Sequence, residues 1–113
     1  MRDAWRAQLE EEFNRARSAR INGKEGQARV CARRAAGIAI REYYSRRGMI
    51  PSNASAYDLL NRLASLPETS LELKRICNDL TMRVSEEFKL PVEVDLVEES
   101  RQLCMALLPD WNP

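Results

Sequence analysis

The chain has 113 residues, of which 44% are hydrophobic and 31% are charged. This balance fits one helical domain spanning residues 1–113 and excludes a disordered tail. Charged residues interrupt every apolar stretch, so we expect no membrane span, which needs about 20 apolar residues. The chain contains no histidine, which excludes histidine-based acid–base catalysis, Ser-His or Cys-His nucleophile pairs and histidine-containing zinc sites.

The cysteine content indicates structural thiols. Cys31, Cys77 and Cys104 are far apart and lack the C-x-x-C spacing of a redox or zinc motif. Each falls on an apolar helical face, where a reduced cysteine behaves as a small hydrophobic residue. The N-terminal residues 1–7 show no apolar signal-peptide segment. We therefore expect a cytoplasmic protein with reduced cysteines and no cofactor.

The charge is distributed unevenly along the chain. Residues 1–50 contain twelve Lys/Arg and six Asp/Glu, whereas residues 51–113 contain six and eleven. One interpretation is that the basic early helices pack beside the acidic late ones, within a chain or across a dimer. The other is an anion or nucleic-acid site, to which the planar donors of arginine are suited. The sequence pI of about 7.7 is lower than that of many nucleic-acid binders.

Two long helices are predicted in the first half of the chain. Hydrophobic periodicity predicts the first over residues 3–19, ended by Asn22-Gly23, a pair that tolerates left-handed backbone. The second is predicted over residues 25–47 and ends at Gly48. One broad face of this second helix carries the residues that we expect in the core: Ala28, Cys31, Ala32, Ala35, Ala36, Ala39 and Tyr43.

The opposite face of the second helix carries the candidate binding residues. Gly37 and Tyr44 lie near its middle, and a glycine inside a helix costs about 0.5–1 kcal/mol relative to alanine. Either another backbone packs closely against Gly37, including across a homodimer, or a planar ligand lies there. We take Gly37 as the close-packing candidate. The candidates for binding an anion or a partner are Arg29, Arg33, Arg34, Arg41 and Tyr44.

Three sequences of the capping-box type begin the later helices, each with its first residue as the N-cap. Residues 55–58 precede a short helix that stops near Pro67. Residues 69–72 open a helix that the periodicity extends to about Lys89. Residues 95–98 open a final helix that ends before Pro109, and Trp111 is expected to fold back as a hydrophobic lid. Together these elements predict an all-α, antiparallel up-down helical bundle of four long helices and one short one.

The late acidic residues offer the other candidate chemistry. Paired carboxylates bind metal ions or carry out acid–base work, but metal sites in bundles commonly combine them with histidine, which is absent here. We expect no metal site and no enzymatic activity. A third interpretation, a hydrolase that uses these carboxylates in catalysis, predicts turnover that depends on a metal ion. The cluster comprises Glu86, Glu87, Glu93, Asp95, Glu98 and Glu99.

This order of elements resembles the HEPN family of small helical bundles. The resemblance rests on the small residues at 27–37, the aromatic pair Tyr43-Tyr44, the loop and short helix at 55–66, and two closing helices, and it covers about residues 4–108. It implies a homodimer and either nucleotide or nucleic-acid binding, RNA included, or a partner such as a small nucleotidyltransferase. Many family members are ribonucleases with an Arg followed by a His in a late helix. Arg101 stands where that Arg would lie, but no His follows, so the resemblance implies a non-catalytic member.

The sequence therefore favours a non-catalytic HEPN-like module that dimerises and binds a nucleotide, nucleic acid or partner protein through its Arg-rich second helix. The alternative is a structural or adaptor protein that has no anionic ligand. In that alternative the arginines only pair with the acidic half of the chain.

Overall fold

The computed structural model describes residues 4–49, 54–82 and 94–111. This part of the chain is entirely helical, with no strand, which confirms the all-α class. None of its helices is long and apolar enough to cross a membrane. The helices are α1 (Ala4–Ile21), α2 (Glu25–Arg46), α3 (Ala56–Ser65), α4 (Leu71–Thr81) and α5 (Leu96–Leu107).

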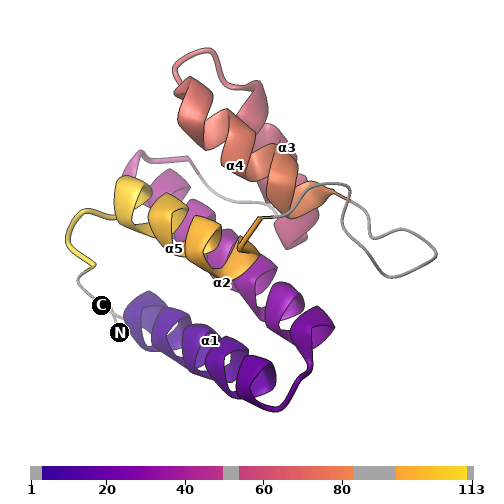
Figure 1. The fold of residues 1–113 in the computed structure, drawn as a ribbon. Coiled ribbons are helices and arrows are strands. Elements are labelled where there is room, and N and C mark those ends of the chain that lie inside the picture. The colour runs from indigo at the N-terminus through magenta and orange to yellow at the C-terminus, as the bar shows by residue number, and fades with distance from the viewer. Residues whose placement is uncertain (1–3, 50–53, 83–93, 112–113) are drawn as a thin grey trace.

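Helix α2 is the centre of the molecule. It packs against α1, α3 and α5, while α4 packs against α3 and α5. Helices α1 and α2 lie side by side, and α3 and α4 form a second hairpin (Figure 1). The up-down arrangement of four long helices is not confirmed, because α1 and α2 have 18 and 22 residues whereas α4 and α5 have 11 and 12.

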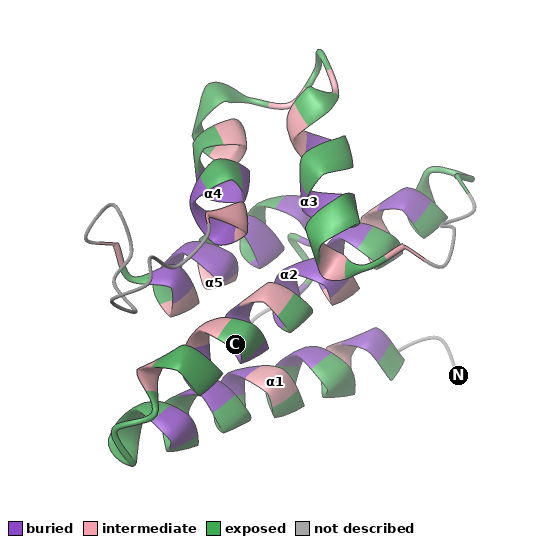
Figure 2. Cartoon of the chain, turned by 90° about the vertical axis from the view of Figure 1, so that its right-hand side faces the viewer, coloured by how far each residue is buried: buried purple, intermediate pink, exposed green. Residues whose placement is uncertain are grey.

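The alanines of α2 allow its neighbours to approach closely. Ala32, Ala35, Ala36 and Ala39 are completely buried, and buried residues cover more than one side of the helix (Figure 2). The hydroxyl of Ser100 on α5 donates to the carbonyl oxygen of Ala32 at 2.7 Å. A side chain on α5 thus reaches the backbone of α2 directly. The small methyl side chains of the alanines allow the two helices to lie close enough for this contact.

The helix starts follow local capping chemistry. The Ser55 hydroxyl accepts from the Asp58 amide at 3.2 Å, and the Asp95 carboxylate accepts from the amides of Val97 and Glu98 at 3.1 Å each. Both N-caps are as predicted.

Helix α4 starts one residue later than its capping box predicts. Its N-cap is Ser70, whose hydroxyl accepts from the Leu73 amide at 3.1 Å. The hydroxyl of Thr69 instead donates to the carbonyl of Leu63 at 2.7 Å, so it joins the loop to α3. Both residues have a hydroxyl that can cap, and the tertiary contact of Thr69 decides which one does.

Helix α4 also ends earlier than the periodicity predicts. Met82 has an extended backbone (φ −62°, ψ 137°), so the helix stops at Thr81 rather than near Lys89. Arg33 on α2 donates to the carbonyl oxygens of Leu80 at 2.6 Å and Met82 at 3.4 Å. Its guanidinium supplies donors to carbonyl groups that a helix end leaves without partners. The expected continuation through Val84 and Phe88 lies outside the described residues.

The segment after α5 folds back over α1, as predicted for Trp111. Trp111 is 3% exposed, and its ring stacks on that of Phe13 with centroids 5.4 Å apart. The Asp110 carboxylate accepts two hydrogen bonds from Arg46, at 2.7 and 2.9 Å, and its backbone carbonyl accepts one from Arg6 at 3.1 Å. These contacts fasten the tail to both α1 and α2.

Candidate functional site

The arginine face of α2 is divided, because the start of α3 lies across its centre. Gly37 is buried, and a Cβ atom placed on it would lie 2.9 Å from the Cβ and 3.2 Å from the Cα of Ala56, the first residue of α3. The close neighbour of Gly37 is therefore a helix of the same chain. Arg33 reaches the end of α4, whereas Arg34 and Arg41 line a hollow between α1, α2 and α3.

The two tyrosines at the end of α2 are placed the other way round from the prediction. Tyr44 is 5% exposed and belongs to the core, and burial raises the pKa of its hydroxyl. Tyr43 is half-buried, with the Arg47 guanidinium 4.6 Å from its ring centroid. The prediction assumed one core-facing side, whereas α2 has helices on several sides. Tyr44 consequently offers no open ring face on which a ligand could stack.

Arg33 lies on the side of α2 that faces the end of α4, and Arg29 is near enough for its charge to act on Arg33. Arg33 is half-buried and holds the carbonyls of Leu80 and Met82. Burial, together with the nearby positive charge of Arg29, lowers the pKa of Arg33. Arg33 therefore helps to fix the position of α4.

Arg34 and Arg41 border a hollow of about 250 Å³ between α1, α2 and α3, which we call the α2 hollow. Arg41 donates to the carbonyl of Ala54 at 2.7 Å, and Arg34 is exposed. A neighbouring hollow of about 240 Å³, toward Trp5, shares Ile38 and Arg41 with it. The α2 hollow is lined by Glu12, Arg34, Gly37, Ile38, Arg41, Ala56 and Leu59.

The α2 hollow carries more positive than negative charge. Among the described residues, neither Arg34 nor Arg41 forms an ion pair with a carboxylate. The one acidic side chain of the lining, Glu12, has Arg15 Nη1 3.7 Å from its Oε2 atom. A hydrogen bond to a neutral carbonyl orients the Arg41 guanidinium without cancelling its charge. Two guanidinium groups at one hollow match a carboxylate or phosphate, which they bind through paired N–H donors.

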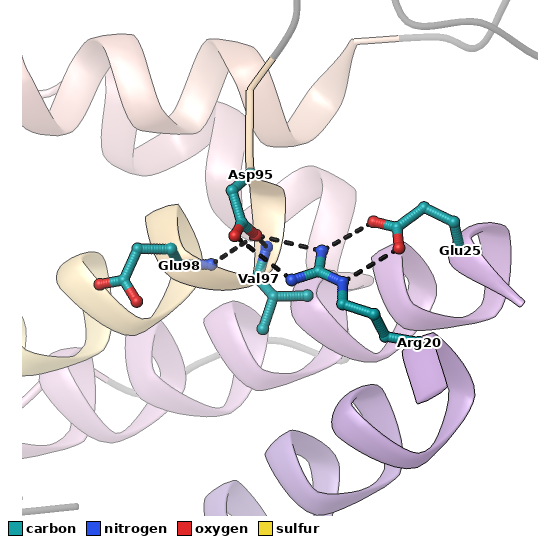
Figure 3. A network of polar contacts seen from close by, with 5 residues as sticks. All are labelled: Arg20, Glu25, Asp95, Val97 and Glu98. Carbon is teal, nitrogen blue, oxygen red and sulfur yellow. Dashed lines mark hydrogen bonds and ion pairs between the residues drawn. The ribbon is translucent and has the colours of Figure 1, made fainter. Parts of the chain in front are cut away.

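Other early arginines pair with late carboxylates, as the interpretation of mutual neutralisation predicts. Arg20 on α1 donates to Glu25 at 2.7 and 3.0 Å and to Asp95 at 3.1 and 3.2 Å (Figure 3). These hydrogen bonds raise the pKa of Arg20. Arg46 and Asp110 form a second pair of this kind. The pairing of the two halves is therefore real for these arginines, and it lies outside the α2 hollow.

The late carboxylates that the structure describes do not assemble into one site. Asp95 caps α5, and Glu99 is buried against Asp79 and Arg75 of α4. Glu86, Glu87 and Glu93 of the predicted cluster lie outside the described residues. In residues 4–49, 54–82 and 94–111, no group of three or more Cys, Asp or Glu side chains could hold a metal ion.

The three thiols are buried, as predicted. Burial raises the pKa of Cys77 to about 11 and that of Cys104 to about 12, and it raises the pKa of Cys31 as well. A thiol that stays protonated is a poor nucleophile. The cysteines therefore act as packing residues.

Sequence reasoning missed Glu12 and Ile38 in the α2 hollow, and it missed Asp79 as the buried partner of Glu99. The pair could have been found from helical spacing. Asp79 follows Ile76 by three residues, and Glu99 follows Leu96 by three, so each carboxylate occupies a core-facing position. A charged residue on a core-facing stripe needs a partner, and Arg75 supplies it.

Arg101, which the HEPN resemblance singles out, is half-buried beside Phe13, with its guanidinium carbon 5.9 Å from the ring centroid. It lines a separate hollow of about 150 Å³ between α1 and α5, together with Arg17 and Arg20. The likeness to the HEPN family stays a prediction. No family model matches the chain, and neither a curated protein nor a solved structure matches it.

Proposed function

We propose that the protein is a non-catalytic helical module that binds an anionic partner, a nucleotide or a nucleic-acid phosphate, through the arginines of α2. The observation that carries the proposal is the α2 hollow. Arg34 stands exposed at its rim and Arg41 beside it, and neither forms an ion pair with a carboxylate among the described residues. A phosphate there would accept hydrogen bonds from two guanidinium groups.

The geometry of Arg41 supports this proposal. Its Nη2 atom is held by the Ala54 carbonyl at 2.7 Å, which limits the freedom of the side chain before any ligand arrives. A donor group that is already oriented loses less conformational entropy on binding. Arg34, which has no hydrogen bond to another described side chain, supplies the adaptable second contact.

We propose a non-catalytic protein because the groups that could act as a nucleophile or a base are missing or not activated. The chain has no histidine, and the buried thiols have raised pKa values. Activation of a serine hydroxyl needs an adjacent base. The buried Ser100 hydroxyl instead donates to the Ala32 carbonyl, so it has a structural role.

The alternative is a structural or adaptor module without an anionic ligand. It is favoured by the internal contacts of several arginines, because Arg33 and Arg41 bond backbone carbonyls and Arg20 and Arg46 bond carboxylates. In this alternative the charge of Arg34 serves only solubility. The homodimer and the small nucleotidyltransferase partner stay predictions under either proposal.

Binding of a short fluorescent single-stranded RNA, followed by anisotropy at several salt concentrations, tests the proposal. We expect Arg34→Gln to weaken binding at low salt and to reduce the slope of log affinity against log salt by about 0.7, the change for one lost phosphate contact on a single strand. Arg34 is exposed, so the substitution should leave the fold intact.

The matched control is Arg62→Gln, which removes the same charge from an exposed position on α3 that does not line the α2 hollow. The proposal requires Arg34→Gln to weaken binding more than Arg62→Gln does. Equal losses would indicate a non-specific attraction to the whole chain. No binding by the wild type at low salt would favour the structural alternative.

A further inference from the structure

The contact between α4 and α5 contains two carboxylates that share one guanidinium. Asp79 on α4 is 7% exposed and Glu99 on α5 is 8% exposed. The same Arg75 nitrogen, Nη1, lies 2.9 Å from Asp79 Oδ2 and 2.6 Å from Glu99 Oε2. Two core-facing carboxylates from different helices therefore meet at one donor atom.

The charges at this contact do not balance if both carboxylates are ionised. The Arg75 guanidinium also donates to Glu72 at 2.7 Å, so one positive charge faces three carboxylates. In addition, Glu99 Oε1 is buried with no hydrogen-bond partner among the described residues. Burying a charged oxygen without a donor is costly, and a proton removes that cost. Burial raises the pKa of Glu99, and the neighbouring Asp79 raises it further.

The other elements packed against α5 add no compensating charge at Glu99 that the structure shows. On α1, Arg20 bonds the Asp95 carboxylate at the start of α5. The contact that α2 makes beside Glu99 is between the Ser100 hydroxyl and the Ala32 carbonyl, which is neutral. Arg33, the charged side chain that α2 extends to α4, is held by the carbonyls of Leu80 and Met82. The charged groups acting on Glu99 are therefore Asp79 and Arg75.

We propose that Asp79 and Glu99 hold one proton between them and form a pH-sensitive latch between α4 and α5, closed when the proton is present and loosened when it leaves. In the closed state the carboxylic acid is neutral and Arg75 balances the remaining carboxylate. As pH rises and the proton is lost, two buried negative charges repel each other across the contact. Loss of the proton therefore loosens the packing of the α3–α4 hairpin against α5, because α4 is the helix of that hairpin that contacts α5.

The sign of the effect follows from linkage. The folded state holds the Glu99 proton more tightly than the unfolded chain, where glutamate has a pKa of about 4.3. The stabilisation is complete below that pH and is lost as pH rises through the higher pKa of the folded state. Between these two values the unfolding constant should increase by up to about tenfold per pH unit, because one proton is released on unfolding.

Glu99→Gln tests the latch, because glutamine keeps the shape of a neutral glutamic acid and cannot ionise. We expect the ratio of the wild-type to the Glu99→Gln unfolding constant to rise with pH from about pH 4 and then to level off above the folded-state pKa. The constants come from urea unfolding followed by far-UV circular dichroism between pH 4 and 8. Glu98→Gln is the control, since Glu98 is the exposed neighbour on the same helix, and its ratio should show no such rise.

A second measurement decides the case even if Glu99→Gln fails to fold. Carbon-13 NMR of the side-chain carboxyl groups of the wild type should show one of the two carboxyls still protonated above pH 4.3. In Asp79→Asn, Glu99 should ionise at a lower pH, because the negative neighbour is gone and Arg75 remains. The latch is refuted if neither carboxyl ionises at a higher pH than a glutamate of the unfolded chain, or if the wild type and Glu99→Gln change in parallel with pH.

Discussion

Gly37 sets the distance between α2 and α3 by lacking a side chain. The Cβ of Ala56 occupies the space where a side chain at position 37 would begin, and the backbone of Ala56 is almost as near. A glycine inside a helix is unfavourable by itself, so the approach of α3 is what offsets its cost. The same approach places α3 on the side of α2 that carries the arginines.

Gly37→Ala should therefore destabilise the protein even though alanine is the better helix former. We expect the free energy of unfolding to fall by about 1–3 kcal/mol, the usual cost of forcing extra volume into a packed interior. Gly26→Ala is the control, because nothing lies within 4 Å of a Cβ at Gly26 in the same helix. Urea unfolding should show it unchanged or more stable by up to about 1 kcal/mol. Equal stability of the two variants would contradict the close packing of α3.

At the level of single residues, the sequence predicted which small side chains are buried. It did not predict which faces of α2 are covered by other helices. The buried alanines of α2 and the buried cysteines follow from spacing and size. The exchange of Tyr43 and Tyr44 does not, because a helical wheel contains no information about a third helix that covers part of the polar side. Only the position of Ala56 shows that this side is partly interior.

Among the elements, the start of α5 is tied to two other helices through one carboxylate. Asp95 accepts from the amides of Val97 and Glu98, and it also accepts from Arg20, which in turn holds Glu25 at the start of α2 (Figure 3). Burial opposes ionisation of Asp95, but the hydrogen bonds from Arg20 and the two amides outweigh it and lower the pKa of Asp95. One residue thus begins a helix and positions it against α1.

Asp95→Ala should lower the free energy of unfolding at pH 7 by about 1–2 kcal/mol, as the loss of an N-cap does. Asp95→Asn keeps a capping oxygen and should lose less. Because the folded-state pKa of Asp95 is lowered, its contribution is present above about pH 4 and disappears as pH falls through that lowered value. Urea midpoints should therefore separate wild type from Asp95→Asn at pH 7, and the difference should be smaller at pH 2.5. A constant difference would contradict the role of its charge.

The sequence located helix starts more accurately than the end of α4. The caps Ser55 and Asp95 act within three residues of themselves, so local sequence contains the signal. The end of α4 coincides with a contact from Arg33, which is 47 residues earlier in the chain than Leu80. No local pattern at residues 71–82 contains that information.

In the molecule as a whole, the segment after α5 joins the two ends of the described chain. Asp110 bonds Arg6 near the start of α1 and Arg46 at the end of α2, and Trp111 lies on Phe13. The Arg46 hydrogen bonds lower the pKa of Asp110. The tail is therefore a constituent of the core and not an appendage.

Trp111→Ala should reduce the free energy of unfolding by about 3–5 kcal/mol, because it removes a large buried aromatic side chain. Asp110→Asn should cost much less, since its ion pairs are exposed to solvent. Thermal unfolding followed by far-UV circular dichroism provides the comparison. If Trp111→Ala were no less stable than Asp110→Asn, the ring would not be part of the core.

The class of fold could be predicted from the sequence, but the arrangement of the helices could not. Periodicity, caps and the scarcity of glycine and proline indicate five helices in the part of the chain that the structure describes. They do not show that α3 and α4 form a hairpin, or that α3 crosses α2 at Gly37. The candidate arginines stay a prediction, and the sequence does not show that Arg33 reaches the end of α4 whereas Arg34 and Arg41 line the α2 hollow.

The stacking of Trp111 on α1 also determines what an optical probe can observe. The chain has two tryptophans, and Trp5 lies under the guanidinium groups of Arg6 and Arg46, the same two arginines that bond Asp110. Both indole chromophores therefore belong to the α1 side of the molecule, and α3 and α4 contain none. Tryptophan emission, excited selectively, would report little while the α3–α4 hairpin separated from α5, so an unchanged tryptophan signal is compatible with a partly opened protein.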